Sequence, residues 1–250
     1  MKIAIITGGS RGLGKSSALH MADKGVGVIL TYNSQKDEAD KVVAEIEKKG
    51  GKAAAIQLDV SNSKNFVAFV SSIKDVLKSK FGSDRFDYLV NNAGTGAYVP
   101  FTEMTEEVFD SLQNIHFKGP YFLTQKLLPI MNDGGRIVNV SSGLARFSVP
   151  GSSAYGALKG AVETWTRYLA KELGPRKITA NVVAPGPIAT DFGGGRVRDN
   201  KEMNAMLSSQ TALGRVGEAD DIGKLVASLV QDDMGWVNAQ RIEASGGIFI

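Results

Sequence analysis

The sequence contains no cysteine and only two histidines, His20 and His116, in 250 residues. Without cysteine the chain cannot form disulfides, thiolate zinc sites or thiol nucleophiles. Two histidines so far apart also argue against a histidine-rich metal site, so we expect no metal. No run approaches about 18 consecutive apolar residues, and we therefore predict no membrane-spanning helix and no membrane partner.

Excess charge of one sign is also lacking, because 29 Lys and Arg residues nearly balance 26 Asp and Glu residues. The net charge of +3 is too small and too dispersed to indicate a nucleic-acid partner. The first strand-like run begins at Ile3, and no charged-then-apolar leader precedes it. We therefore expect no signal peptide and a cytoplasmic location.

Short β-branched runs alternate with longer amphipathic stretches along the chain, which predicts a parallel sheet covered on both faces. With right-handed crossovers, this gives an α/β fold with a doubly wound, parallel seven-stranded sheet of Rossmann type. Predicted strands are Lys2–Ile6, Gly27–Thr31, Ala53–Leu58, Tyr88–Asn91, Arg136–Val140, Thr179–Val183 and Gln240–Ala244. Predicted helices cover about 12–24, 35–49, 62–80, 105–130, 152–173, 201–209 and 218–231.

No linker or low-complexity segment divides the chain, so we predict a single domain over residues 1–250. The one loop-rich stretch contains Pro185-Gly186-Pro187 and Gly193-Gly194-Gly195. Long glycine-rich loops within compact domains are usually functional. We therefore predict a substrate lid at about 186–206.

A glycine-rich turn, Thr7–Gly14, follows the first strand and opens the first helix. Glycines let the backbone approach a pyrophosphate at the positive helix N-terminus, as in dinucleotide-binding folds. The same stretch also satisfies the P-loop pattern of nucleotide triphosphatases, with Lys15 for phosphates and Ser16 for magnesium. The only fair candidate for the metal-binding acid of that reading is Asp59. The P-loop interpretation leaves the other motifs of the chain without a role, so dinucleotide binding is favoured.

Tyr155 and Lys159 are four residues apart on a predicted helix, thirteen and seventeen positions after Ser142. Side chains at positions i and i+4 share a helix face. One cation about 5 Å away supplies about 3 kcal/mol at an effective dielectric of about 20. Bringing a phenol pKa from about 10 to about 7 requires about 4 kcal/mol. The spacing therefore predicts that Lys159 lowers the pKa of Tyr155 and makes it an acid or base near neutral pH. Ser141 is the neighbour that could be mistaken for Ser142.

In their order and spacing these motifs resemble the short-chain dehydrogenase/reductase family, in its compact single-domain branch. The resemblance covers essentially the whole chain and also rests on Asn91–Gly94, Pro185-Gly186 and Ala244–Gly247. It implies nicotinamide-dependent oxidation or reduction of a carbonyl/alcohol pair. The catalytic residues that it implies are Asn114, Ser142, Tyr155 and Lys159.

Each of these residues has a role implied by the resemblance. Ser142 would bind the substrate oxygen, Tyr155 would transfer the proton, Lys159 would bind the nicotinamide ribose and Asn114 would hold a relay water. Asp59 would face the adenine, Asn91 the adenosine side and Thr190 the carboxamide. The implied cofactor-binding residues are Gly8, Ser10, Arg11, Gly12, Leu13, Gly14, Tyr32, Asn33, Ser34, Asp59, Val60, Asn91, Ala93, Gly94, Tyr155, Lys159, Pro185, Gly186, Ile188 and Thr190.

The end of the second strand bears on the choice of nucleotide. NAD-specific members of such folds place an acid there for the ribose 2′-hydroxyl, but here the strand ends in Tyr32-Asn33-Ser34. Arg11, in the glycine turn, offers a planar fork that suits a phosphate. The missing acid and the available cation favour NADP(H).

These observations predict an NADPH-dependent oxidoreductase that reduces a ketone or aldehyde, with Tyr155 as proton donor. The alternatives are an NAD-dependent alcohol dehydrogenase and a non-catalytic NADP-binding sensor. We expect a mostly apolar substrate pocket built from Gly96–Tyr98, Leu144–Val149 and Pro187–Gly195. A carrier protein would need a basic surface, to which Arg176 and Lys177 could contribute and Asp133 does not, so fatty-acid synthesis is not assigned.

Family resemblance also implies a homo-tetramer that pairs the helices at 105–130 and 152–173. The apolar end Ile248-Phe249-Ile250 is expected to pack against its own core or a neighbouring subunit. Trp165 and Tyr168 are expected at a second buried interface.

Overall fold

Seven parallel strands form one sheet, in the order β3-β2-β1-β4-β5-β6-β7, in the computed structural model, which describes residues 1–250. The chain leaves β1 in one direction to build β2 and β3, and then crosses back to build β4 to β7. The strand order therefore reverses between β1 and β4, where this fold class binds its ligands, at the carboxyl ends of the strands. The strands are β1 (Ile3–Ile6), β2 (Gly27–Tyr32), β3 (Ala53–Gln57), β4 (Phe86–Asn91), β5 (Met131–Val140), β6 (Thr179–Pro185) and β7 (Arg241–Ala244).

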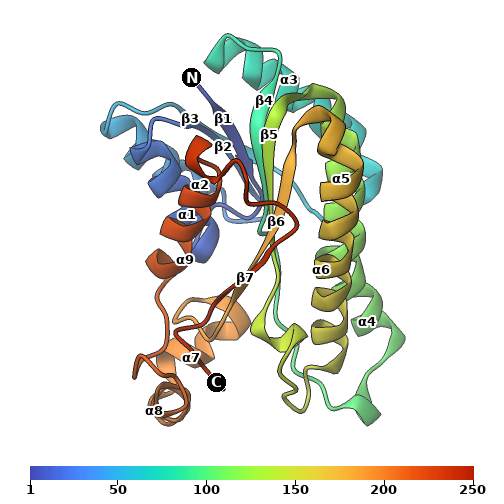
Figure 1. Ribbon diagram of the computed structural model, residues 1–250, viewed down its shortest axis with the longest axis vertical. Coiled ribbons are helices and arrows are strands. Elements are labelled where there is room, and N and C mark those ends of the chain that lie inside the picture. The colour runs from blue at the N-terminus through green and yellow to red at the C-terminus, as the bar shows by residue number, and fades with distance from the viewer.

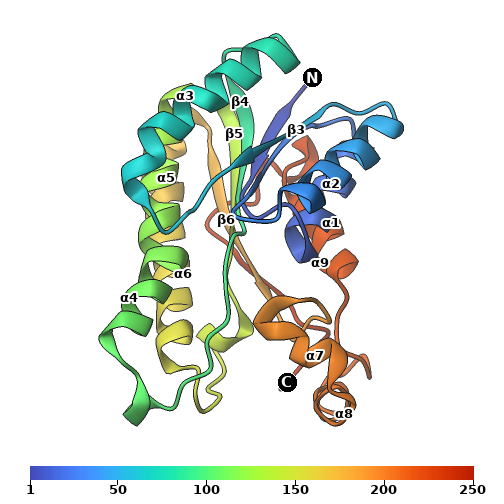
Figure 2. The ribbon, with the colours of Figure 1, turned by 180° about the vertical axis from the view of Figure 1, so that it is seen from behind.

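Helices cover both faces of the sheet (Figure 1). One face is covered by α1 (Gly12–Asp23), α2 (Lys36–Lys48) and α9 (Ala219–Leu229). The other is covered by α3 (Phe66–Val76), α5 (Gly119–Leu127) and α6 (Ser153–Leu173), as the reverse view shows (Figure 2). Because both faces are covered, the strands are apolar along their length; all four residues of β1 are buried.

The first and last helices on their face pack very closely. A Cβ on Gly223 of α9 would lie 2.2 Å from the Ser16 Oγ of α1, so only glycine fits there. The Ser16 hydroxyl donates to the Asp220 carboxylate at 2.6 Å, and His20 lies 3.2 Å from the same oxygen. This contact fixes α1, and with it the glycine turn, against a segment more than 200 residues later in the chain.

The helix predicted over 105–130 is interrupted. It consists of α4 (Glu106–Gln113), a π-helical turn (Asn114–Lys118), α5 and a 3₁₀ turn (Leu128–Ile130). Its start is as predicted, because the Thr105 hydroxyl accepts from the Val108 N–H at 3.4 Å. A Cβ on Gly119, just after the π-turn, would lie 2.1 Å from the Val60 carbonyl oxygen. The π-turn thus brings the helix backbone against the loop that follows β3.

The helix predicted over 62–80 is also composite. It comprises a 3₁₀ turn (Ser63–Asn65), α3 and a second π-turn (Leu77–Phe81) that ends at Gly82, whose φ is +65°. Other short 3₁₀ turns are Phe101–Glu103, Gly143–Ala145, Gly174–Arg176 and Asp232–Met234.

The segment predicted as a lid contains a 3₁₀ turn (Phe192–Gly195) and two helices, α7 (Arg196–Asp199) and α8 (Lys201–Ser209). These helices lie beyond the carboxyl ends of the strands, at the bottom of Figure 1. None of the helices combines the length and apolar character that a membrane-spanning segment needs.

Candidate active site

The glycine turn forms a tight cradle at the start of α1. Gly12 has φ of +54°, which favours glycine, and a Cβ on Gly14 would lie 2.1 Å from the Gly8 carbonyl oxygen. No side chain caps the N-terminus of α1 at Arg11, so its first N–H groups have no side-chain partner. Ser10 is buried under the turn and Leu13 is half-buried. This is the backbone environment that a pyrophosphate requires.

The side chains that a P-loop would use point elsewhere. Lys15 lies 3.4 Å from the Glu45 carboxylate of α2, and Ser16 is engaged by Asp220 of α9. Neither side chain is directed at a phosphate held by the turn. The geometry therefore fits dinucleotide binding and does not fit magnesium-dependent triphosphate binding.

The end of β2 carries no acidic side chain that would repel a phosphate. Tyr32 is half-buried, whereas Asn33 and Ser34 are exposed and carry no acid. Lys36 is already bound to Asp40 at 2.5 Å, whereas the Arg11 guanidinium has no hydrogen-bond or ion-pair partner. Arg11 is the free cation at this corner, so the residues present fit NADP(H).

Two turns are tied together by a side chain that the sequence prediction did not single out. Asn92 donates through its amide to the carbonyls of Thr7 and Gly8 at 2.9 and 3.1 Å. Its own N–H and that of Ala93 donate to the Thr7 hydroxyl at 3.0 Å. The pair Asn91-Asn92 in the sequence could have pointed to this role. Asn92 holds the glycine turn in place beside the turn that follows β4.

Asn91 lies inside the molecule and does not reach the surface of the cradle. Its amide donates to Thr124 at 3.0 Å and to Asn139 at 2.8 Å, while its Oδ1 is buried without a partner. Gly94, by contrast, is exposed at the end of the turn, as is Asp59 after β3. Asp59 accepts from the N–H and hydroxyl of Ser61, and Val60 is buried behind it.

Ser142, Tyr155 and Lys159 come together at the carboxyl end of β5 and the start of α6. The Lys159 ammonium lies 5.6 Å from the centre of the Tyr155 ring, and the Ser142 hydroxyl is near enough to the phenol to lower its pKa. Lys159 is 5% exposed and donates to the Val140 carbonyl at 2.8 Å. The Ser142 hydroxyl also accepts from the Leu144 N–H at 3.2 Å, which orients it.

The protonation of Tyr155 differs from the sequence prediction. Burial raises the pKa of the phenol to about 12, although its hydrogen bond with Ser142 lowers it in part. Burial also lowers the pKa of Lys159 to about 8. Desolvation therefore determines the direction of the Tyr155 shift, and Lys159 does not lower this pKa; residue spacing does not reveal burial. Tyr155 is protonated at neutral pH, the state that a proton donor needs.

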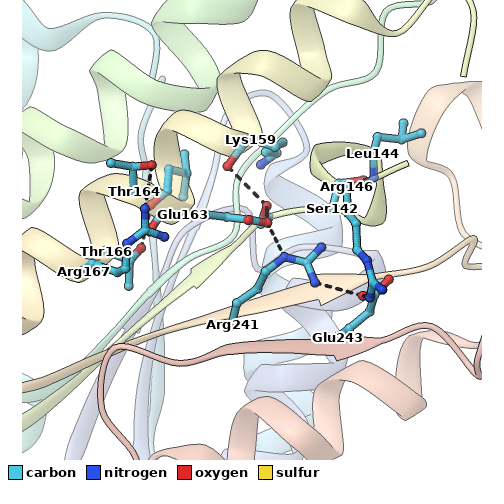
Figure 3. Close-up of polar contacts among 12 residues, drawn as sticks. Ser142, Leu144, Arg146, Lys159, Glu163, Thr164, Thr166, Arg167, Arg241 and Glu243 are labelled. Carbon is cyan, nitrogen blue, oxygen red and sulfur yellow. Dashed lines mark hydrogen bonds and ion pairs between the residues drawn. The ribbon is translucent and has the colours of Figure 1, made fainter. Parts of the chain in front are cut away.

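Ser141 has a different task from Ser142. Its hydroxyl donates at 2.8 Å to Glu163, one helical turn beyond Lys159, and Glu163 accepts from Arg241 of β7 at the same distance. Glu243 accepts from both Arg241 and Arg146, at 2.9 and 3.0 Å (Figure 3). This network joins α6 and β7 to the loop after Ser142. The Arg146 side chain is therefore held by Glu243 at the edge of the site.

His116 is the side chain at the site that the sequence analysis left without a role. It is 2% exposed, and its ring meets the Tyr155 ring edge-on at 5.0 Å between centroids. Asn114 begins the same π-turn, and its carbonyl accepts from the Gly119 N–H. A lone buried histidine is ordinarily a core residue, so no feature of the sequence favoured His116 over Asn114 as a functional residue.

The segment after β6 closes the site from the lid side. Pro185 is buried, and a Cβ on Gly186 would lie 2.8 Å from the Ser245 Cα, so the loop passes close to the Ser245–Gly247 turn. Ile188 pairs with Gly217, and Thr190 lies beside Gly12 of the cradle. Phe192 then lies 6.1 Å from Tyr155, ring to ring.

A family model described as "Enoyl-(Acyl carrier protein) reductase" matches residues 8–248, nearly the whole chain. The chain is a member of the short-chain dehydrogenase/reductase family. An uncharacterised oxidoreductase of Methylorubrum extorquens is 39% identical over 99% of this chain and 97% of its own length. A tetrahydroxynaphthalene reductase of Pestalotiopsis fici is 34% identical over 98% of this chain and 91% of its own.

Among solved structures, the angucycline C-6 ketoreductase LanV with bound NADP superposes with a TM-score of 0.93 and 37% identity, covering 98% of this chain and 95% of that one. The promiscuous reductase LugOII, which catalyses keto-reduction in lugdunomycin biosynthesis, also has a TM-score of 0.93 and 37% identity, over 98% and 96%. This short-chain dehydrogenase/reductase thus has the predicted fold, and both the predicted family and the oxidoreductase class are confirmed.

Proposed function

We propose that the protein is an NADPH-dependent reductase of ketones or aldehydes, with Tyr155 as the proton donor. The observation that carries the proposal is a protonated, buried Tyr155 phenol that lies close to Ser142 and to a buried Lys159. This group lies where the strand ends, the glycine turn and the lid meet. Binding a nucleotide alone would not require such a proton-transfer set.

In this proposal NADPH supplies a hydride to the carbonyl carbon when it is bound. Ser142 donates a hydrogen bond to the carbonyl oxygen and holds it beside Tyr155. Tyr155 then gives its proton to that oxygen as negative charge develops there. Lys159 binds the ribose of the nucleotide and stabilises the phenolate that is left, while Asn114 remains a candidate for the relay.

The preference for NADPH rests on Arg11, the free cation near the end of β2, and on the absence of an acid at Tyr32-Asn33-Ser34. Gly8, Gly12 and Gly14 leave room for the pyrophosphate, and Thr190 lies close enough to the cradle to meet the nicotinamide end. LanV, a relative at 37% identity, was solved with NADP bound, which supports the same choice.

A multi-ring aromatic ketone is the substrate class that we propose. Aromatic side chains lie on the loops around the site: Tyr98 packs against Gly151 and Arg196, Phe192 contacts Tyr155, and Phe147 contacts Phe249. Relatives named for naphthalene and angucycline substrates share this fold over nearly their whole length. A substrate presented by a carrier protein is not favoured, because Arg176 is bound to Asp133 at 2.7 Å and to two carbonyls.

The experiment is to follow NADPH absorbance with a panel of aromatic and aliphatic ketones and aldehydes, and to repeat it with NADH. We expect oxidation of NADPH with aromatic ketones and a much lower kcat/KM with NADH. Faster alcohol oxidation with NAD would indicate the dehydrogenase alternative. NADPH binding without turnover on any compound would indicate a sensor, and magnesium-dependent ATP hydrolysis would restore the P-loop interpretation.

We also infer a homo-tetramer. Aromatic side chains are exposed on α5 and α6, where Tyr121 and Phe122 are each 39% exposed and Tyr168 is 64% exposed. Trp165, expected at an interface, is instead buried within the chain against Phe117 and Tyr121.

A further inference from the structure

The backbone of Thr95 holds His116 in one orientation, with its N–H 3.4 Å and its carbonyl oxygen 2.7 Å from Nε2, and the shorter contact decides the tautomer. Its Nε2 lies 2.7 Å from the Thr95 carbonyl oxygen, a hydrogen bond that requires the proton to be on Nε2. The other ring nitrogen, Nδ1, is then an acceptor, and it is buried without a partner in the protein. Burial, and to a lesser degree Lys159, lower the pKa of His116 to about 3. The ring is therefore neutral at physiological pH, with a free lone pair.

The same small pocket is lined by His116 and Lys159, together with Asn91, Asn139 and Thr7. The Lys159 ammonium has three N–H groups and uses one of them on the Val140 carbonyl. The Oδ1 of Asn91 is a second acceptor without a partner. Apolar side chains make up half of the pocket lining, and the free donors and acceptors in the other half can supply the two to four partners that an ordered water needs.

Asn114 is not among the residues that line this pocket. Its carbonyl already accepts from the Gly119 N–H of the π-turn. π-Turns often mark functional positions, because the extra residue redirects the side chains that follow. Here the side chain in contact with Tyr155 is that of His116.

We propose that His116 is a positioning residue for proton transfer: its ring sets the Tyr155 phenol edge-on, and its Nδ1 accepts a hydrogen bond from a water shared with Lys159. The inference rests on the proposed reductase function. In that reaction the carbonyl carbon gains a hydride from NADPH, which becomes NADP⁺, and the carbonyl oxygen gains the Tyr155 proton. The phenolate then recovers a proton from solvent through the water and Lys159.

Two substitutions separate the two properties of the ring. His116→Phe keeps an aromatic ring beside Tyr155 but has no acceptor, whereas His116→Asn places an amide acceptor near the Nδ1 position. We expect kcat of His116→Phe to fall at least about 10-fold, with a larger solvent isotope effect and an unchanged Kd for NADPH. His116→Asn should recover most of the lost kcat. Tyr168→Phe, at an exposed position of α6, should behave as wild type.

Nitrogen NMR of protein labelled at histidine provides a readout that does not depend on turnover. With only two histidines, the His116 signals can be assigned by His116→Asn, and they should show Nε2–H and a bare Nδ1 from pH 5 to 8.

A protonated Nδ1 would overturn the proposal. So would wild-type kcat and isotope effect in His116→Phe, or equal loss in Phe and Asn variants. A larger isotope effect in Asn114→Ala but not in His116→Phe would assign the relay to Asn114. Inactivity of the wild-type enzyme on every carbonyl would instead refute the reductase function and leave the NMR result standing.

Discussion

Tyr155 is buried with its phenol close to Ser142, and it is protonated at neutral pH because burial raises its pKa to about 12. Tyr155→Phe removes only that hydroxyl and leaves the ring contacts with His116 and Phe192. We expect kcat to fall at least about 100-fold, the lower end for loss of a general acid. The Kd for NADPH, measured by fluorescence titration, should stay unchanged. Tyr168→Phe, an exposed tyrosine on the same helix, is the matched control, and near-normal turnover of Tyr155→Phe would refute the mechanism.

Arg11 should determine the nucleotide. Arg11→Ala is expected to weaken the binding of NADPH by about 1.5–3 kcal/mol, the range for a lost charged hydrogen bond. The binding of NADH should stay nearly unchanged. The measurement is kcat/KM for both nucleotides. Lys36→Ala is the control, because Lys36 is exposed and already bound to Asp40. Equal losses for the two nucleotides would make Arg11 a structural residue of the turn.

His116 should also make the protein sensitive to acid. Its pKa is lowered to about 3 by burial and by Lys159, whereas an unfolded histidine titrates near pH 6.5. Between these values the unfolded chain binds the proton and the folded one does not, so stability falls as the pH falls. At pH 4.5, which is about two units below the unfolded pKa and still above the folded one, this costs about 3 kcal/mol of unfolding free energy. Urea unfolding at pH 7 and 4.5 should show that His116→Phe loses less free energy of unfolding on acidification than the wild type does. An identical loss would contradict the neutral, buried state of His116.

At the scale of elements, the lid segment contains a glycine turn that can act as a hinge and ion pairs that hold this turn in place. Gly193, Gly194 and Gly195 have φ values of +62°, +76° and +75°, a conformation open mainly to glycine and costly to fix. Arg198 pairs with Asp191 across this turn and with its neighbour Asp199. We predict that hydrogen exchange over about 186–206 slows when NADPH binds, because the lid then orders over the nicotinamide. Protection that is already high without nucleotide, and does not change, would make the segment a rigid wall.

The seven strands and most helices were predictable, because apolar runs such as Ile3–Ile6 follow directly from burial on both faces. Breaks inside helices were not predictable. The stretch 105–130 keeps its amphipathic pattern through the π-turn, which depends on the close approach of Gly119 to the Val60 carbonyl. The role of Glu163 was equally hidden, since its partner Arg241 lies 78 residues away. Tertiary contacts of this kind leave no local signal.

At the scale of the whole molecule, the exposed aromatic residues of α5 and α6 lead us to expect a tetramer. Light scattering at micromolar concentration should report about four times 26.6 kDa. Tyr168→Glu should shift the protein toward smaller species, since burying one such side chain is worth about 1.5–3 kcal/mol. Val67→Glu, at a similarly exposed position on α3, is the control. A monomer in the wild type would refute the expectation.

The chain end contributes less to such an assembly than its apolar sequence indicates. Ile248 is buried within its own chain beside Thr211, and Phe249 contacts Phe147, so only Ile250 is almost fully exposed. Deleting all three residues would disturb the loop after Ser142. Removing Ile250 alone is therefore the cleaner test of an interface at this end.

The docking of α1 on α9 has a consequence for biosynthesis. The surface of α1 around Ser16 has its partner at Asp220 and Gly223, so the helix that carries the glycine cradle cannot be fully covered until α9 has been synthesised. At about 5–20 residues per second, the roughly 200 residues between the two helices take about 10–40 s to synthesise. Messages truncated before codon 219 would release chains whose sheet is largely made and whose nucleotide cradle is unsupported. These chains should be cleared by proteolysis more rapidly than the loss of residues 219–250 alone would suggest.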